Sequence, residues 1–422
     1  MIKIYKYMQA SINMKKRGME RNNYKKKNKL TLVFCLSIIL FILLIFLLFI
    51  LIGGFGKIRL APITVDGGGQ AAIVNAINQA NPGDTIEVMH CNYDDGSDNY
   101  LTITKDGTAS DPFTLKAIGN PRAKLGNIKF NAASYWVLDG FEIGPLDYPS
   151  AADMIAAISV ENTPSSNILI KNMYIHDISG HGIELLDGSF HTVLNSSVSN
   201  TVNKYDPDNS GHNGAHAIQI TDAHNSKILN NSLFGFIADA IQMRWVTKDA
   251  NGNEIPINRG TTIIEGNKMY NTQGPCAENA LDIKAELGTV IVRKNIIHGF
   301  RPLTTFGCTY VASGSGESPT ILCHQSSTAS LTIEQNEFYN NYQGIDNRAC
   351  PAIIRNNIFH DFNFGYRVDE TTHQNTSRVL GVFIAESNQD VYHNTFKNIP
   401  SLINDNINGN PDFRNNIFYN AD

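Results

Sequence analysis

The chain has 422 residues, with 34 Lys and Arg against 39 Asp and Glu. Its first 30 residues hold ten of the basic residues and a single acid, Glu20, so the remainder carries 24 basic and 38 acidic residues and a net charge of −14. Nucleic-acid binding requires a basic footprint. The acidic remainder therefore argues against a nucleic-acid partner.

Residues 31–52 form an uninterrupted apolar run without a charge. At about 1.5 Å per residue the run is long enough to cross a hydrocarbon core of roughly 30 Å, and the basic residues 1–30 place that end in the cytoplasm. A cleaved signal peptide is the alternative, but the run exceeds the usual ~7–15 residues and no A-x-A cleavage site follows. We therefore expect a single-pass signal anchor, a linker at 53–62, and an extracellular or luminal domain at 63–422.

The outer domain opens with a short amphipathic segment at 70–80. Its apolar residues Ala72, Val74, Ile77 and Ala80 are expected on one helix face, and the sequence NPGD ends the helix before a strand. A repeat protein needs a cap over its first repeat. We expect this helix to be that cap.

One short pattern recurs between about 165 and 420: apolar, polar, apolar, one or two polar residues, Asn, then apolar again. The closest spacing of these asparagines, roughly 21 residues, suits one coil of a β-solenoid, which buries its apolar face only by stacking on its neighbours. Asn at a tight turn tolerates left-handed backbone angles, and its amide can bond to the equivalent Asn one coil along. The expected structural ladder consists of Asn172, Asn195, Asn231, Asn267, Asn295, Asn336, Asn357, Asn394 and Asn416.

The outer domain contains an odd number of cysteines: Cys91, Cys276, Cys308, Cys323 and Cys350. Disulfides are stable outside the cytoplasm. At least one of these cysteines is expected to stay free or to pair between chains, and the sequence leaves the pairing open.

These features resemble the right-handed parallel β-helix of the pectin lyase-like superfamily, which includes pectate, alginate and chondroitin lyases. The resemblance rests on the opening helix with NPGDTI, on the segment GTASDPFTLKA at 107–117 and on the asparagine ladder. It covers residues 63–422 and implies an all-β, right-handed parallel β-helix with an N-terminal capping helix. The superfamily also holds hydrolases, tailspikes and non-catalytic binding proteins, so the fold alone does not fix an activity.

A second strand series recurs once per coil, and each strand is recognised by an inward apolar pair. The strands are expected at 181–186, 216–221, 239–244, 280–284, 320–324, 344–348 and 365–369. Alternation along a strand, with equivalent positions stacked about 4.8 Å apart, predicts two outward columns. The first column is Glu184, Gln219, Gln242, Asp282, Leu322, Asp346 and Arg367. The second column is Leu186, Thr221, Arg244, Lys284, His324, Arg348 and Asp369.

The second column forms a basic stripe in an otherwise acidic domain. It fits β-elimination in an acidic, uronate-containing polysaccharide, because that reaction needs the uronate carboxylate neutralised and a base held over the ring carbon. We expect Lys284 to be the base, with a pKa lowered by burial and by its cationic neighbours Arg244 and His324. Arg348 or Arg244 is expected to hold the substrate carboxylate. The first column supplies the expected substrate-binding residues Glu184, Gln219, Gln242 and Asp346.

Calcium is the expected cofactor, since Ca²⁺ held by Asp or Glu oxygens also neutralises a uronate carboxylate. The segment ENALDIKA at 278–285 is similar to the part of calcium-dependent lyases in which acidic ligands precede a catalytic Lys. The resemblance implies Glu278 and Asp282 as ligands and Lys284 as base. We expect Asp239 to add a ligand from the preceding coil.

Three alternatives stay open. The triplet GHG at 180–182 matches one signature of the polygalacturonase hydrolases, although their paired aspartates are missing. A Zn²⁺ site is a second alternative, at His181, His212, His216 and His224. The third is an anchored β-helix that binds a glycan or a partner surface without chemistry. A groove around Lys284, walled by the loops at 245–260 and 302–318, would favour the enzyme over the binding module.

Overall fold

The computed structural model describes part of the chain. The described residues are 36–45, 61–93, 100–147, 155–162, 165–202, 214–244, 258–271, 277–284, 286–300, 319–324, 328–341, 343–362, 382–384, 389–399 and 411–421. They belong to two compact units, Met1–Ala61 and Pro62–Asp422.

In the first unit, residues 36–45 are helical and their large apolar side chains are exposed. The rest of the expected span at 31–52 lies outside the described residues. No helix among the described residues has both the length and the apolarity to cross a membrane. The membrane anchor and its orientation therefore stay predictions.

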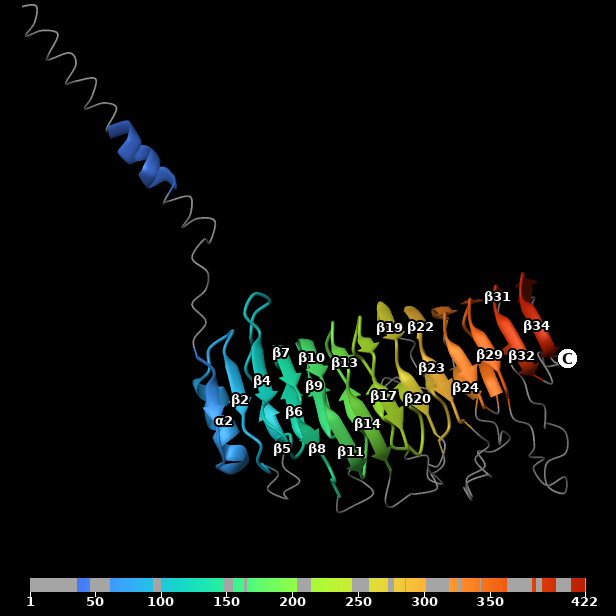
Figure 1. Cartoon of the computed structure of the whole chain (residues 1–422), viewed down its shortest axis with the longest axis horizontal. Helices are drawn as coiled ribbons and strands as arrows, with labels where there is room; N and C mark the ends of the chain where they lie inside the picture. Colours follow the sequence, from blue (N-terminus) through green and yellow to red (C-terminus); the bar gives the residue numbers. More distant parts are fainter. Residues whose placement is uncertain are drawn as a thin grey trace, which may run out of the picture. The chain divides into compact units, whose positions relative to one another are not determined.

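The second unit is a stack of short parallel strands that form three sheets, and the strands follow one another in chain order from α2 in blue to β34 in red (Figure 1). Sheet A contains β1 (Ile63–Val65), β2 (Thr85–Val88), β4 (Phe113–Ala117), β7 (Ser134–Asp139), β10 (Ser166–Lys171), β13 (Thr192–Leu194), β16 (Lys227–Leu229), β19 (Thr261–Glu265), β22 (Thr289–Arg293), β25 (Ser330–Glu334), β28 (Ala352–Arg355), β31 (Gln389–Tyr392) and β33 (Pro411–Arg414). Sheet B contains β5 (Lys124–Leu125), β8 (Glu142–Ile143), β11 (Tyr174–Ile178), β14 (Ser197–Thr201), β17 (Ser232–Phe234), β20 (Lys268–Tyr270), β23 (Ile296–His298), β26 (Glu337–Tyr339), β29 (Ile358–His360), β32 (Thr395–Ile399) and β34 (Ile417–Ala421). Sheet C contains β3 (Leu101–Ile103), β6 (Ile128–Asn131), β9 (Ile158–Glu161), β12 (Ile183–Leu185), β15 (Ile218–Ile220), β18 (Ile241–Met243), β21 (Leu281–Lys284), β24 (Pro319–His324), β27 (Gln343–Asn347) and β30 (Val382–Ile384).

This topology confirms the predicted parallel β-solenoid. A strand of one sheet pairs with the strand of the next coil, so sequence neighbours lie in different sheets and spatial neighbours lie one coil apart. Inward positions alternate with outward ones along each strand. The inward side chains form one continuous core, and in sheet B they include a stack of rings, Phe338, Phe359 and Phe396, with centroids 4.6 and 5.0 Å apart. The exposed ring of Phe418 continues the stack, 5.3 Å from Phe396.

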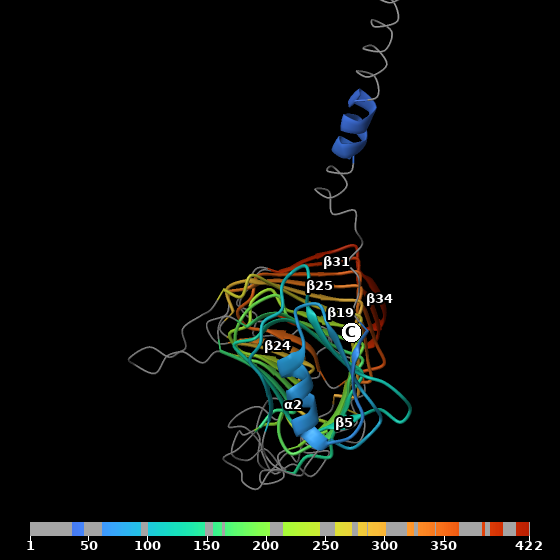
Figure 2. The same cartoon turned by 90° about the vertical axis from the view of Figure 1, so that its left-hand side faces the viewer.

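The helix α2 (Gly69–Gln79) closes the first coil, as expected. Figure 2 looks along the stack and shows α2 in front of the space that the sheets enclose. Ile73, Ala76 and Ile77 are its buried residues and belong to the core, whereas Ala72 and Val74, expected on the buried face, are only partly buried. Lys105 Nζ donates to the carbonyl oxygens of Ile77 and Asn78, at 3.2 Å each, and so satisfies the end of the helix.

The asparagine ladder is confirmed from Asn231 onward. Each side-chain Oδ1 accepts from both the backbone N–H and the Nδ2 of the Asn one coil before it, for example 2.8 and 3.1 Å between Asn267 and Asn295. The chain of bonds runs through Asn231, Asn267, Asn295, Asn336, Asn357, Asn394 and Asn416.

The prediction is wrong for Asn172 and Asn195, which occupy the adjacent position. Both have left-handed backbone angles, with φ of 55° and 50°. In these coils the next residues, Met173 and Ser196, take the ladder position: Ser196 Oγ accepts from Met173 N–H, and Ser196 N–H donates to Asn231 Oδ1. The turn thus has two consecutive positions that favour Asn, one for its backbone and one for its amide.

The cysteine pairing left open by the sequence is partly resolved. Cys323 and Cys350 form a disulfide with 6.1 Å between their Cα atoms, and Cys91 is the free cysteine among the described residues. Cys276 and Cys308 lie outside the described residues. Cys323 precedes His324, and Cys350 follows Arg348 by two residues, so the disulfide joins two coils next to the predicted site.

Candidate functional site on the outer face of sheet C

The first outward column of sheet C has the predicted register over six coils. Successive strand pairings bring together Glu184, Gln219, Gln242, Asp282, Leu322 and Asp346. In the second column, Lys284 and His324 are direct partners. The place predicted for the seventh strand, 365–369, belongs to β30 (Val382–Ile384), which pairs with β27 and has Phe383 as the register partner of Asp346. Arg367 and Asp369 lie outside the described residues.

Asp282 is the centre of the site. Its side chain is buried, and it contacts two partly exposed cations or potential cations: Lys284 Nζ lies 2.7 Å from Oδ2, and His324 Nε2 lies 3.0 Å from Oδ1. Burial alone would raise the pKa of Asp282, but Lys284 and His324 lower it below its usual value. The carboxylate is thus held ionised between two donors on neighbouring coils.

The predicted low pKa of Lys284 is wrong. Burial pushes it down, but the charges of Asp282, Asp239 and Glu278 outweigh burial and raise the pKa above its usual value. Lys284 is therefore a protonated ammonium in this arrangement. The sequence argument weighed its cationic neighbours along the column and missed the carboxylates that surround it.

Asp239 lies behind this centre in a buried chain of hydrogen bonds. His181 Nδ1 accepts from His216 N–H (3.1 Å), His216 Nδ1 accepts from Asp239 N–H (3.2 Å), and Asp239 Oδ1 accepts from Asn279 N–H (3.1 Å). Gln242 Nε2 donates to Asp239 Oδ2 at 3.0 Å. Burial, followed by the charge of Asp282, raises the pKa of Asp239 well above its usual value.

The predicted calcium ligands do not form a ready calcium site. Both oxygens of Asp239 accept from Asn279 and Gln242, and both oxygens of Asp282 contact Lys284 and His324. Glu278 is partly buried and acts on Lys284 through its charge. Within the described parts of the chain no group of three or more His, Cys, Asp or Glu residues is placed to hold a metal ion. The Asp282 carboxylate therefore binds the ammonium group of Lys284 where a calcium ion was expected.

The Zn²⁺ alternative likewise has no set of ligands placed together among the described residues. His181 and His216 stack on each other with ring centroids 5.2 Å apart. Burial lowers the pKa of both imidazoles, that of His216 to about 3. His224 pairs instead with Ser189 at the edge of sheet A, and His212 lies outside the described residues.

Arg348 and Asp346 form a second ion pair further along the face. Arg348 Nε donates to Asp346 Oδ2 at 2.8 Å, and the guanidinium stays 43% exposed, so it can reach a ligand. Asp346 itself is 2% exposed, and in the part of the chain that the structure describes its Oδ1 is a buried acceptor without a hydrogen-bond partner. Burial raises its pKa, against the charge of Arg348. Such an orphaned acceptor is costly unless a ligand supplies the donor.

Arg244 lies toward the other end of the face, near Glu184, whose pKa its charge lowers against the effect of burial. Its backbone is fixed by a residue that sequence analysis missed. Arg259 is fully buried, pairs with Glu286 at 2.6 Å, donates from Nε to Thr221 O at 2.5 Å, and donates from Nη2 to Arg244 O. No local pattern predicts the burial of Arg259, which lies inside the expected loop at 245–260. The loop parts 245–257 and 301–318 lie outside the described residues.

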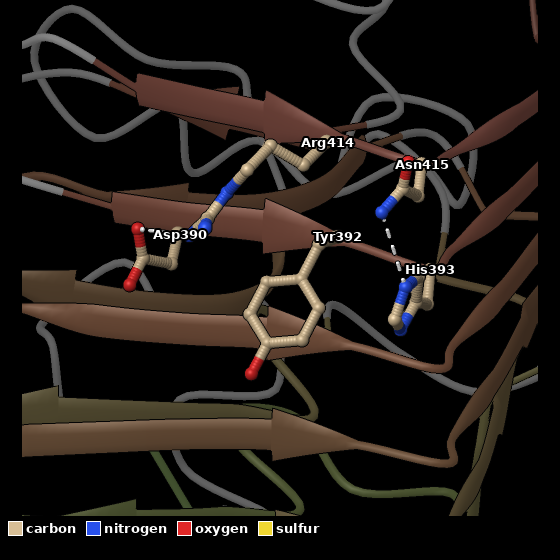
Figure 3. Close-up of a pocket in the computed structure, with 5 residues that line it drawn as sticks. All are labelled: Asp390, Tyr392, His393, Arg414 and Asn415. Atoms are coloured by element: carbon tan, nitrogen blue, oxygen red, sulfur yellow. Dashed lines mark hydrogen bonds and ion pairs between the residues drawn. The ribbon is translucent and has the colours of Figure 1, made fainter.

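A shallow hollow lies elsewhere, on sheet A near β33. Figure 3 shows its lining residues, Asp390, Tyr392, His393, Arg414 and Asn415. Arg414 is already paired with Asp390 (3.2 Å) and Asp412 (3.0 Å), and Asn415 Nδ2 lies 3.4 Å from His393 Nε2. The predicted site residues belong to sheet C, and none of them lines this hollow.

Comparison with known proteins identifies the fold. No protein-family model matches the sequence, and neither does any curated protein. Among solved structures, the chain is similar to the surface adhesin PfbA of Streptococcus pneumoniae, with 14% identity over 86% of this chain and 90% of that chain and a TM-score of 0.55.

Two polysaccharide lyases are similar as well. One is a mannuronic acid specific family 6 lyase from human gut microbiota, with 13% identity over 85% of this chain and 82% of that chain and a TM-score of 0.53. The other is a family 6 lyase from Pseudopedobacter saltans, with 11% identity over 86% and 92% and a TM-score of 0.50. At such low identity these similarities show that the chain shares the parallel β-helix fold of polysaccharide lyases and of an adhesin.

Proposed function

We propose that the outer face of sheet C binds an acidic, uronate-containing polysaccharide and cleaves it by β-elimination. The observation that carries the proposal is the buried Asp282 carboxylate, which holds Lys284 at 2.7 Å and His324 at 3.0 Å on adjacent coils. The two family 6 lyases with this fold support it as analogues, since both are named polysaccharide lyases and one is named as specific for mannuronic acid, a uronate.

The raised pKa of Lys284 changes its proposed role from base to electrostatic partner. As an ammonium, Lys284 neutralises the uronate carboxylate and stabilises the negative charge that develops on it, and the exposed Arg348 further along the face can add to this. His324 is the better base: if Nε2–H donates to Asp282, the neutral ring keeps an unprotonated Nδ1. This is the orientation that a carboxylate gives to histidine in hydrolytic triads.

The proposed step uses only groups of this chain and water. His324 Nδ1 takes the proton from the ring carbon next to the uronate carboxylate, and the electron pair forms a double bond to the neighbouring carbon. The bond from that carbon to the glycosidic oxygen breaks, and the leaving oxygen takes a proton from water. The carboxylate oxygens of Asp239 and Asp282 already contact protein groups, so no step is assigned to calcium. Calcium, with Glu278, Asp282 and Asp239 as ligands, stays a proposed cofactor that the experiment below tests.

The test uses the full-length chain in detergent with polygalacturonate, alginate, chondroitin sulfate and heparin, with Ca²⁺ or with EDTA. The ultraviolet absorbance of the unsaturated uronate end is followed. We expect the absorbance to rise with at least one glycan, and the rate of this rise to fall at least 100-fold in His324→Ala and in Lys284→Ala. A retained rate in His324→Ala with loss in Lys284→Ala would return the base role to Lys284. No rise with any glycan would overturn the lyase.

A second candidate function is glycan or surface binding without chemistry. Its supporting observation is that the cations Lys284 and Arg348 already pair with Asp282 and Asp346, which favours recognition over proton transfer. The adhesin with the same fold is an analogue for this role. Retention of a folded protein on one glycan, with no rise in absorbance, would establish the binding module.

We also propose that residues 31–52 anchor the chain as a single-pass membrane protein. The support is the apolar run and the ten basic residues before it, which by the positive-inside rule keep the N-terminus cytoplasmic and the β-helix extracellular or luminal. The β-helix is proposed to be right-handed, as parallel crossovers nearly always are. Protease added to intact cells should digest the β-helix and leave the N-terminal end protected. Complete protection in intact cells would contradict an extracellular β-helix, and digestion of the β-helix from the cytoplasmic side of isolated membranes would contradict this orientation.

A further inference from the structure

The N-terminal coils of the sheet C outer face carry a separate acidic cluster. Glu161 lies on β9 and Glu184 on the adjacent β12, where Glu184 pairs in register with Ser159. Lys129 Nζ contacts Glu161 Oε1 at 3.1 Å, and Ser159 Oγ donates to the same oxygen at 2.8 Å. Lys129 also lies 4.4 Å from the ring centroid of Tyr100. The charge of Glu161 is therefore already matched within the protein.

Glu184 has no comparable cationic partner at contact distance among the described residues. His181 Nε2 lies 3.5 Å from Oε1 of its carboxyl group. Because His181 Nδ1 accepts from His216 N–H and burial lowers the pKa of the ring well below its usual value, His181 is a neutral donor. Burial, followed by the charge of Glu161, raises the pKa of Glu184 to about 7, against the more distant Arg244 and Lys129.

Gln219 supplies the second, independent observation. It is the direct register partner of Glu184 on the next coil. Its side chain is 3% exposed, and its Oε1 is buried without a hydrogen-bond partner among the described residues. Its Nε2 makes a long contact of 3.4 Å with Thr221 Oγ1. Two acceptor side chains thus occupy equivalent positions on adjacent strands, which are spaced about 4.8 Å apart. Gln219 Oε1 is orphaned among the described residues, and Glu184 has only the 3.5 Å contact with the neutral His181.

We propose that Glu184 and Gln219 bind the protonated amine of an amino sugar in the glycan, one that is not N-acetylated. An ammonium group has three donors, enough for the Glu184 carboxylate and Gln219 Oε1 together, and its charge compensates the buried carboxylate. Asp282 lies three strand spacings further along the column, roughly 14 Å at about 4.8 Å per strand. The inferred substrate therefore carries a free amine on one sugar and a uronate two or more sugars away.

This inference rests on the proposed glycan-binding function and names its substrate class. The test is calorimetric titration of the full-length chain in detergent, at a pH near 7.5, with a glucosamine hexamer, with its N-acetylated counterpart, and with a galacturonate hexamer. We expect the glucosamine hexamer to bind and the N-acetylated hexamer to bind at least tenfold more weakly. Glu184→Gln and Gln219→Leu should each weaken glucosamine binding, the first by at least tenfold.

The matched control is Glu334→Gln, which removes a carboxylate from the outer face of sheet A, where Glu334 pairs with Arg355 at 2.7 Å. It should leave glucosamine binding unchanged, and an equal loss in this variant would show general attraction to an acidic domain and overturn the inference. Binding of galacturonate with no preference for the free amine would overturn this inference alone. No binding of either hexamer would overturn the proposed function and the inference together.

Discussion

Two columns of stacked polar side chains run along this solenoid, and they differ in how their polar atoms are paired. In the ladder, Asn267, Asn295 and Asn336 repeat one geometry, in which every amide donates to the next Oδ1 at 2.9–3.1 Å and to a backbone carbonyl. In the outer column of sheet C, the side chain changes along the column and no single geometry repeats, and among the described residues Gln219 and Asp346 keep a buried acceptor without a partner. The ladder is complete without a ligand, whereas the sheet C column is not.

This difference separates a structural column from a candidate binding surface. Burial alone does not separate them, because Asn295 and Asp282 are both 1% exposed. Pairing does: the ladder satisfies its donors and acceptors internally, and the sheet C column leaves acceptors for a ligand. The following predictions test this comparison, from the largest expected effect to the smallest.

The largest loss of stability is expected where buried charge fixes the frame behind sheet C. Arg259→Leu leaves Glu286 buried without its cation and the carbonyl groups of Thr221 and Arg244 without a donor. We expect the free energy of unfolding to fall by about 3–5 kcal/mol, measured by denaturant unfolding. The double variant Arg259→Met/Glu286→Leu should recover part of this free energy of unfolding. A double variant less stable than Arg259→Leu would contradict a buried pair.

Breaking the ladder in its middle should come next. Asn295→Leu leaves the N–H and Nδ2 of Asn267 and the carbonyl group of Ile264 without partners. Each of these three groups costs about 1 kcal/mol at the lower end of the range for a buried unpaired group, so we expect a loss of about 3 kcal/mol. Asn416→Leu, at the last coil and part-buried, is the matched control with a smaller loss. Equal losses in the two variants would mean that the cost of breaking the ladder does not depend on how deeply the Asn is buried.

Glu184→Gln should increase stability, in contrast to the ladder variant. The pKa of Glu184 is raised to about 7 in the folded state from an ordinary value of 4.5. Its stabilising protonation is fully present below pH 4.5 and is lost as pH rises through 7. We therefore expect the variant to be more stable than the natural protein by about 2–3 kcal/mol near pH 8 and nearly equal to it near pH 4.5. A variant that is less stable near pH 8 would show that Glu184 has an internal cation.

The smallest effect is expected at Gln219. Gln219→Leu removes an orphaned acceptor and a long contact of 3.4 Å, so we expect a change within about 0.5 kcal/mol in either direction. Thermal unfolding measures it beside Asn295→Leu. A loss as large as that of the ladder variant would remove the distinction between the two columns.

The sequence was sufficient for the fold and for the register of the site. Period-two alternation around inward pairs such as Leu281 and Ile283 places Asp282 and Lys284 outward, and the structure has the same register. The place predicted for 365–369 belongs to β30 because this other segment, with Val382 and Ile384 as its apolar pair, has the same alternation. Pattern alone does not decide between two such segments.

The electrostatics of the site needed the structure. Asp239 precedes Lys284 by one coil, and its influence on the pKa of Lys284 depends on side-chain direction, which the alternation pattern does not give. Arg259 and Glu286 were missed for a related reason. Each is an ordinary charged residue beside a loop, and only the packing at the corner of the coil turns them into a fully buried pair.

The most direct test of the central claim is the affinity for uronate oligosaccharides at the Lys284 site. Calorimetric titration of the full-length chain in detergent compares Lys284→Ala with Lys171→Ala, which removes a lysine paired with Asp139 at 3.2 Å on the outer face of sheet A. The account predicts at least tenfold weaker binding of the best-bound acidic hexamer in Lys284→Ala and unchanged binding in Lys171→Ala. Equal affinity of the natural protein and both variants would contradict it.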